Sequence, residues 1–377
     1  MKAFVFTDEA LASRTGQFVW LSIDTEKAVN APFLAKFPVS VWPSFYVLDP
    51  ANEIVALRWV GGATVAQLQK ILDDGRAAVR GRPSGLEETL ARADRLYGQQ
   101  KNAEAAEAYR GVLARAPSGW PRYARTVESL LFALDASRQS EACARTARDA
   151  FSRLGRTSSA ANIASSGLDC ALRLPAESPE RTELVAALEG AARQALAATD
   201  VPMAADDRSS VYISLLDARD DARDEEGKKK VASEWASFLD GEAARAKTPA
   251  ARAVFDSHRL TAYLELQQPE RAIPMLEASE RDFPDDYNPP ARLAVAYKAM
   301  KRYDDALSAS DRALARAYGP RKLLILQTRA DIYTARGDSA AARRTLEQAL
   351  ETAESFPPGQ RSETTIAAIR KKLETVP

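Results

Sequence analysis

Small residues recur at a nearly constant interval in the C-terminal part of this chain. Ala272, Ala306 and Ala342 lie 34 and 36 residues apart, and each belongs to a segment with apolar residues at helical spacing. Pro284 and Pro357 follow the first and last of these segments. A helical hairpin of this length cannot bury its apolar face alone, so neighbouring hairpins stack. The interval therefore predicts a curved array of helical hairpins.

The helical pattern extends over residues 86–377, where Ala, Arg, Glu, Asp and Leu dominate. Its predicted parts are a first hairpin over Leu86–Pro117, a looser one over Gly119–Leu154, two longer and degenerate hairpins over 156–246, regular hairpins from Gln268 to Phe356, and a polar cap helix over Gln360–Val376.

These segments resemble tetratricopeptide repeats, whose period is about 34 residues. The resemblance is strongest in the first hairpin and in the last three. It implies a concave surface built by the first helix of each hairpin, which binds a protein or peptide partner. Our candidate binding residues on that surface are Asp94, Tyr97, Lys298, Gln327 and Asp331.

Some tetratricopeptide domains clamp the C-terminal carboxylate of a chaperone with Lys and Asn side chains on these first helices. The corresponding positions of this chain hold Ala291 and Val295, or Gln327 and Asp331. We therefore expect no carboxylate clamp in these repeats.

Residues 1–80 follow a different pattern, in which short apolar runs alternate with turn residues. The predicted elements are a strand over Phe18–Asp24, a helical turn over Asn30–Phe37, a strand within Val39–Pro50 that opens at Pro43, a strand over Glu53–Val60, a break at Gly61-Gly62 and a helix over Thr64–Leu72.

This order of elements resembles a thioredoxin-like domain. Trp42-Pro43 stands where that family keeps a cis-proline, and Gly61 stands where it keeps a glycine on the substrate side. In the family, the backbone beside the cis-proline pairs with an extended segment of the substrate protein. The resemblance therefore implies a second binding site at Trp42, Pro43, Gly61 and Gly62.

The cysteine motif of the thioredoxin-like family is missing from this segment. By spacing, its Cys-x-x-Cys would lie on a helix entered just before Met1, and two of the family's strands would also lie upstream. We interpret Met1 as an internal methionine of a longer chain. The alternative is a degenerate fold in which a strand over 18–23 pairs directly with a strand over 44–48.

Cys143 and Cys170 are the only cysteines, and His258 is the only histidine. Neither cysteine has CxxC or metal-finger spacing, so we expect both to be small buried side chains rather than a disulfide or metal ligands. A single histidine argues against a His-rich metal site and a catalytic triad. We expect no catalytic residue, no metal and no cofactor.

The 52 Lys and Arg residues equal the 52 Asp and Glu residues. Such a balance gives no net field that would attract nucleic acid. No apolar stretch reaches the roughly 18 to 20 residues of a membrane span. We expect a cytoplasmic location for this chain, or a periplasmic one if an upstream signal peptide precedes it. The oligomeric state cannot be read from the sequence.

The predicted organisation is therefore α+β and mostly α: an incomplete thioredoxin-like α/β domain over 1–80, a linker over 81–85 and an all-α helical repeat domain over 86–377. The favoured function is a protein interaction scaffold without redox cysteines. The alternative is a thiol-disulfide oxidoreductase whose cysteine motif lies outside this chain, and only such a motif would make it an enzyme.

Overall fold

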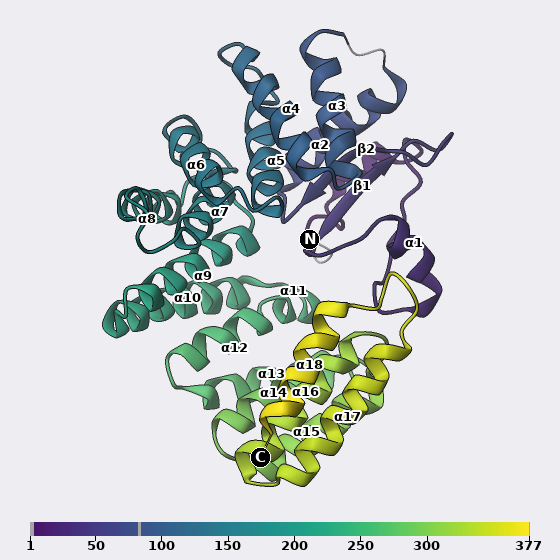
Figure 1. Cartoon of the computed structure of the whole chain (residues 1–377), viewed down its shortest axis with the longest axis vertical. Coiled ribbons are helices and arrows are strands. Elements are labelled where there is room, and N and C mark those ends of the chain that lie inside the picture. Colours follow the sequence, from purple (N-terminus) through teal and green to yellow (C-terminus); the bar gives the residue numbers. More distant parts are fainter. Residues whose placement is uncertain (1–3, 82–83, 377) are drawn as a thin grey trace. The chain divides into compact units, whose positions relative to one another are not determined.

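The computed structural model describes residues 4–81 and 84–376 and is mostly helical (Figure 1). Its contacts divide the chain into two compact units. The first unit comprises Met1–Thr15 and Val41–Val231, and the second comprises Gly16–Ser40 and Ala232–Pro377. Residues 82 and 83 of the predicted linker at 81–85 lie outside the described residues, and the helices before and after it end at Arg80 and begin at Leu86. The domain boundaries drawn from the sequence stay a prediction.

The first unit contains an antiparallel pair of strands, β1 (Ser44–Leu48) and β2 (Val55–Val60). Ser44 lies opposite Val60, and the register shifts between Val47 and Leu48. Every residue of β2 is buried, whereas every residue of β1 is partly buried. Both strands lie where the sequence predicts them, and β2 is the more deeply buried strand of the hairpin.

Helices cover both faces of this hairpin (Figure 1). On one face lies α2 (Val65–Arg80), so close that a Cβ at Gly75 would come within 2.6 Å of Val47. On the other face lies α3 (Leu86–Gly98), where the Arg58 guanidinium of β2 stacks over the Tyr97 ring. Because side chains of a strand alternate between its faces, these two contacts give a layer of strands between two helices.

The helix after the glycines is confirmed and is longer than predicted. Thr64 caps α2 by accepting a hydrogen bond from the backbone N–H of Gln67, whose side chain accepts one from the Thr64 N–H. This capping box satisfies two backbone donors that the helix itself leaves unpaired.

The predicted strand over Phe18–Asp24 is wrong. These residues belong to no helix or strand, no described strand pairs with them, and the side chains of Val19 and Leu21 are 89% and 70% exposed. The alternative in which 18–23 pairs with 44–48 is wrong too, since β1 pairs only with β2 in the described chain. A strand-forming sequence makes a strand only where a neighbour accepts its backbone hydrogen bonds. The interpretation of Met1 stays a prediction.

The residues after this segment are held within the second unit instead. Tyr318 donates its hydroxyl to Asp24 at 2.8 Å, and the Gln360 amide donates to the backbone oxygen of Thr25 at 2.8 Å. A short helical segment follows, as predicted, and consists of a 3-10 turn over Ala28–Asn30 and α1 over Ala31–Lys36.

The helical hairpins of the first unit follow the predicted segments. After α3 come α4 (Asn102–Arg115), α5 (Tyr123–Ala136), α6 (Ser140–Leu154), α7 (Ala160–Leu172), α8 (Arg181–Ala197), α9 (Ala205–Asp221) and α10 (Glu225–Arg245), whose last part belongs to the second unit. The last four helices occupy the stretch where two degenerate hairpins are expected, and α7 packs against α8.

The second unit continues the series and ends in the predicted cap. It contains α11 (Pro249–Ala253), α12 (Asp256–Glu265), α13 (Ala272–Asp282), α14 (Asn288–Ala299), α15 (Tyr303–Arg316), α16 (Arg321–Arg336), α17 (Ser339–Ser355) and α18 (Glu363–Thr375). The recurring residues Ala272, Ala306 and Ala342 are fully buried, as close helix packing requires.

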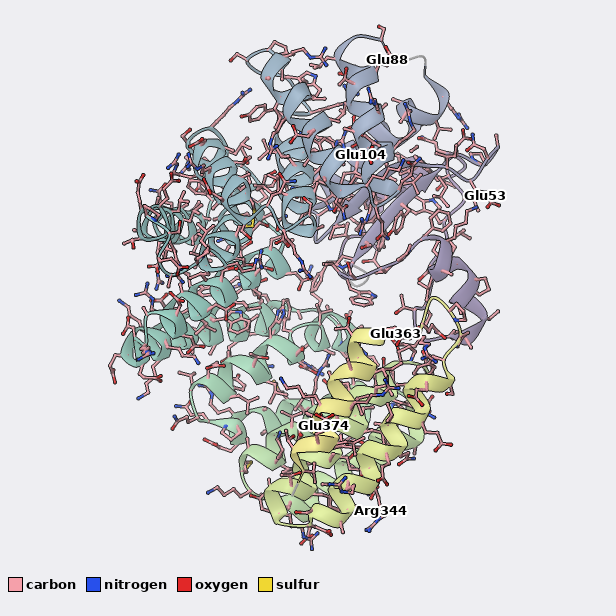
Figure 2. The ribbon with its side chains drawn as sticks, in the orientation of Figure 1. Glu53, Glu88, Glu104, Arg344, Glu363 and Glu374 are labelled. Carbon is pink, nitrogen blue, oxygen red and sulfur yellow. A yellow bond between two sulfur atoms is a disulfide. The ribbon has the colours of Figure 1, made fainter. Side chains whose placement is uncertain are left out.

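The cap helix α18 has one buried face and one polar face. Ile366 and Ile369 are buried against the apolar cluster of α16 and α17. Glu363 and Glu374 are exposed on α18, and Arg344 is exposed on α17 (Figure 2). A terminal helix of this kind covers the last apolar face of a repeat array. No helix in the described ranges is both long and apolar enough to cross a membrane.

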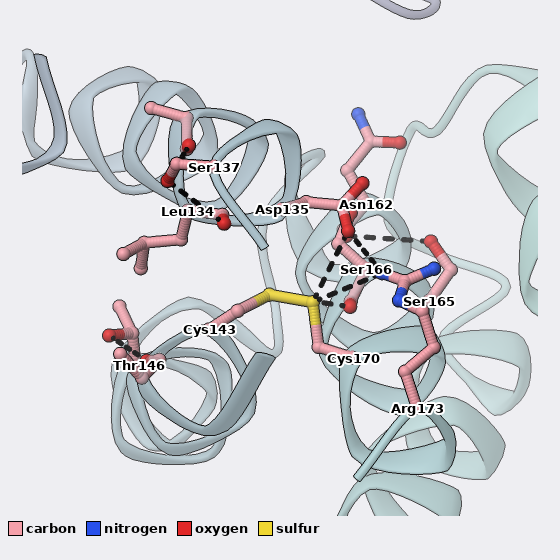
Figure 3. The surroundings of a disulfide bond; sticks show 12 residues. Leu134, Asp135, Ser137, Cys143, Thr146, Asn162, Ser165, Ser166, Cys170 and Arg173 are labelled. Carbon is pink, nitrogen blue, oxygen red and sulfur yellow. Dashed lines mark hydrogen bonds and ion pairs between the residues drawn. A yellow bond between two sulfur atoms is a disulfide. The ribbon is translucent and has the colours of Figure 1, made fainter. Parts of the chain in front are cut away.

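The prediction for the two cysteines is half wrong. Both side chains are fully buried, as expected, but Cys143 of α6 and Cys170 of α7 form a disulfide with a Cα–Cα distance of 6.0 Å (Figure 3). Their 27-residue separation matches no disulfide motif. The helices α6 and α7 pack side by side, and only this packing brings the two sulfurs together.

Replacing both cysteines by alanine should destabilise the protein. Loop-closure entropy for this separation gives a loss of about 3.5 kcal/mol in the free energy of unfolding. Urea unfolding monitored by circular dichroism measures the loss. A reductant should destabilise the wild type to the level of the Cys143→Ala/Cys170→Ala variant and leave the variant unchanged. Equal stability of the oxidised wild type and the variant would contradict the prediction.

Candidate functional site

The Trp42-Pro43 peptide bond is cis, as the sequence predicts. It lies directly before β1, where the Pro43 carbonyl accepts a hydrogen bond from the Gly61 N–H at 2.9 Å. The Ser44 hydroxyl donates to the Val41 carbonyl at 2.7 Å. The cis-proline and the glycine are thus brought together at the same end of the strand pair.

The side chains that precede the proline are exposed to solvent. Trp42 is 57% exposed and Val41 is 45% exposed. β1 uses one edge to pair with β2, and no strand in the described residues pairs with its other edge. An exposed aromatic beside an edge strand is a suitable surface for strand addition by an extended peptide.

The turn of Gly61 and Gly62 lies at the same end of the strand pair and makes buried contacts. Gly61 has a φ of 94°, a conformation that favours glycine. The Gly62 carbonyl accepts from the Trp59 indole N–H at 3.1 Å, and the Gly62 N–H donates to Asp207. A Cβ at Gly62 would lie 2.6 Å from the Asp207 Oδ1. Gly62 is therefore a buried supporting residue, whereas Gly61 is partly buried.

Asp94 does not lie on an exposed face, so that expectation is wrong. It is 2% exposed and accepts hydrogen bonds from the Tyr109 hydroxyl at 2.8 Å and from both terminal nitrogens of Arg125 at 3.0 and 3.1 Å. Arg125 also pairs with Asp74 of α2 at 2.9 Å. Asp94 is thus part of a buried ionic network.

Tyr97 is also buried, at 3% exposure, because β2 covers this face of α3. The Arg58 guanidinium lies 4.7 Å from its ring centre. Burial raises the pKa of Tyr97 to about 12, and the charge of Arg58 opposes that rise. No local pattern indicated that β2 would pack against this face of α3 rather than leave it to a partner.

In the second unit the predicted candidates do reach the surface. Lys298 of α14 and Gln327 and Asp331 of α16 are partly exposed, and α12, α14 and α16 contact one another in that order. Lys372 of α18 donates to both oxygens of Asp331 at 2.9 and 3.1 Å. Asp331 is therefore neutralised by Lys372, which leaves Lys298 and Gln327 of these three candidates.

No reactive constellation was found in the described residues. The two sulfurs are bonded to each other, and Figure 3 shows Arg173 and Asp135 beside them. Groups of three or more His, Cys, Asp or Glu side chains that could hold a metal do not occur in the described part of the chain.

An open hollow of about 760 Å³ lies at the start of α6 and is partly lined by Arg145 and Arg173. Arg145 pairs with Glu141 at 2.8 Å, and Arg173 pairs with Asp135. Carboxylates therefore offset the charges of both arginines, and we assign the hollow no function.

The comparisons with known proteins bear on the second unit. Residues 287–355 match the family model of the tetratricopeptide repeat. The chain contains tetratricopeptide repeats. The match covers α14, α15, α16 and α17, which hold Lys298, Gln327 and Asp331.

Two solved structures match this chain at low identity and low TM-score. A tetratricopeptide repeat protein from Parabacteroides merdae is 12% identical, with 77% of this chain and 99% of that chain covered and a TM-score of 0.45. The TPR2AB-domain:pHSP90 complex of yeast Sti1 is 15% identical, with 77% and 98% covered and a TM-score of 0.28. No curated protein matches this chain.

Replacing Asp94 by alanine should lower the free energy of unfolding far more than replacing an exposed acid. The variant leaves the buried Arg125 with fewer partners, and breaking a buried pair costs about 3 to 5 kcal/mol. The matched control is Asp73→Ala, which removes the partner of Arg14 at an exposed site and should cost about 1 kcal/mol or less. Urea unfolding of both variants measures the difference, and equal losses would refute the buried network.

Proposed function

We propose that this chain is a protein interaction scaffold that binds an extended segment of a partner protein. The observation that carries the proposal is the tetratricopeptide match over 287–355, together with the partly exposed face of α14 and α16 within it. Repeat arrays of this kind bind along a continuous helix face rather than in a closed pocket. On this face Lys298 offers a charge, and Gln327 offers both a donor and an acceptor.

We further propose that residues 41–80 are a thioredoxin-like module that contributes a second binding edge. The support is the order of the cis Trp42-Pro43 peptide, the antiparallel hairpin β1–β2, Gly61 and the helix α2 packed on the hairpin. An extended peptide could hydrogen-bond to the open edge of β1 while Trp42 packs against its side chains.

A thiol-disulfide oxidoreductase remains the second candidate, and the cis-proline is the observation in its favour. The chemistry needs an accessible thiolate, often at a helix N-terminus. Cys143 and Cys170 are fully buried and bonded to each other in α6 and α7. We therefore expect this chain to reduce no protein disulfide in a turbidity assay with insulin and dithiothreitol. Activity above the uncatalysed rate would favour the enzyme.

The disulfide also supports a location. Such bonds form and persist in oxidising compartments and are rare in cytosolic proteins. Of the two locations expected from the sequence, we propose the periplasmic one. Protein recovered from cells under thiol-blocking conditions should carry no free thiol, and two free thiols would favour the cytoplasm.

Truncating the polar groups of the repeat face should weaken peptide binding. The ligand is the tightest peptide selected from a random library on the full chain, and fluorescence anisotropy gives its dissociation constant. Lys298→Ala/Gln327→Ala should raise that constant about tenfold or more, because hydrogen bonds to charged groups contribute about 1.5 to 3 kcal/mol. The control Lys371→Ala removes an exposed charge from α18 and should change nothing. Equal affinities would exclude this face.

The Trp42 edge calls for a separate measurement. A peptide that forms a strand beside β1 should bind about tenfold more weakly to Trp42→Ala, since buried tryptophans dominate interfaces. The control Ile54→Ala truncates an apolar side chain of the same module that is 44% exposed. Far-UV circular dichroism should stay unchanged in both variants. Loss of binding in neither variant, or in both, would remove Trp42 from the site.

A further inference from the structure

Two carboxyl groups are buried next to the glycine turn of the first unit. Glu128 of α5 is 1% exposed and accepts a hydrogen bond at its Oε2 from the Asn162 amide of α7 at 2.8 Å. Asp207 of α9 is 3% exposed and accepts one from the Gly62 N–H. The two side chains come from different helices, and the charge of Asp207 raises the pKa of Glu128.

Each carboxyl leaves one oxygen unused. The Glu128 Oε1 and the Asp207 Oδ2 are buried and have no hydrogen-bond partner in the described residues. Ionising a carboxyl group with a buried oxygen that accepts no hydrogen bond costs free energy, because that oxygen has lost its hydrogen bonds to water and has no replacement. A proton on that oxygen removes the charge and supplies a donor.

The surroundings favour the protonated forms. Burial raises the pKa of Glu128 to about 8, and the charge of Asp207 adds to this rise. Ser159, Asn162 and the charge of Arg125 act in the opposite direction and lower the pKa. Arg125 is itself engaged by Asp74 and Asp94.

Asp207 behaves in the same way. Burial raises its pKa to about 7, with a further rise from Asp206 and an opposing hydrogen bond from Gly62. Around neutral pH these two carboxyls therefore gain or lose protons while their surroundings stay charged as before.

The glycine turn connects this pair to the cis-proline. Gly62 is bonded to Asp207 through its N–H and to the Trp59 indole through its carbonyl. The neighbouring Gly61 N–H donates to the Pro43 carbonyl at 2.9 Å. A change at Asp207 therefore acts on a turn of two residues that also holds the peptide before β1.

We propose that Glu128 and Asp207 form a proton-operated latch that holds the Gly61-Gly62 turn, and with it the Trp42-Pro43 peptide, against α5 and α9. With at least one carboxyl protonated, the pair tolerates burial and Asp207 retains Gly62. When both protons pass to solvent at higher pH, two unsolvated negative charges repel, and the turn opens toward water. The latch acts in the free protein and does not depend on the proposed binding function.

The direction of the pH effect follows from linkage. In the unfolded chain both carboxyls ionise near their ordinary pKa of about 4, whereas in the folded chain they keep their protons to higher pH. The folded and closed state is therefore favoured at acidic pH. This preference weakens as the pH rises from about 4 to about 8 and changes no further above that.

Hydrogen exchange of the full, oxidised chain tests the latch. Protection factors, corrected for the intrinsic pH dependence of exchange, are measured by mass spectrometry for peptides spanning 58–64. We expect protection there to fall about tenfold or more between pH 6 and pH 9, since each pKa unit corresponds to a tenfold change. Peptides from α14–α17 should keep their protection. Unchanged protection at 58–64, or an equal loss in both regions, would overturn the proposal.

Neutral variants identify the groups responsible. Asp207→Asn keeps an oxygen that can accept from Gly62, and Glu128→Gln keeps one that can accept from Asn162, but neither side chain ionises. Each should flatten the pH profile at 58–64, while the control Asp149→Asn, at an exposed acid of α6, should retain the wild-type profile. A wild-type profile in Asp207→Asn and Glu128→Gln would refute the latch. If neither variant folds, the wild-type comparison of the two regions decides.

Discussion

The guanidinium of Arg125 links three helices that are separate in the sequence, α2, α3 and its own helix α5. It pairs with Asp74 of α2 and Asp94 of α3 from its own position on α5. A buried cation is tolerated only when opposite charges surround it, and here two carboxylates do so. This one side chain therefore links α2, α3 and α5 in the interior of the first unit.

The same packing explains why the strand pair can exist at all. Two strands alone bury too little apolar surface to be stable in water. Here α2 and α3 cover both faces of the hairpin, so β2 is fully buried even though only β1 pairs with it. The outer edge of β1, with the cis-proline at its start, is left as the accessible part of the module.

Sequence reasoning identified the features that depend on neighbours along the chain. The hairpins over 86–377, the helix capped by Thr64 and the two strands after Pro43 follow from local spacing and turn chemistry, whereas the cis bond was implied by the family resemblance. The predictions were wrong where contacts with a segment distant in the sequence determine the local structure. Phe18–Asp24 has strand composition but no adjacent strand, and Asp94 and Tyr97 lie on a helix face that β2 and α5 cover. The Glu128–Asp207 pair had no signal in the sequence.

The sequence by itself determined the repeat period and the positions of the helices, because periodicity and backbone preference act over a few residues. Only the tertiary structure decided which side chains meet. Cys143 and Cys170 form a disulfide because α6 lies beside α7. Asp94 forms an ion pair because α5 brings Arg125 to it, and Asp207 binds Gly62 because α9 lies beside the glycine turn. The burial that sets the pKa values of Glu128 and Asp207 is likewise a property of packed helices, which single residues do not encode.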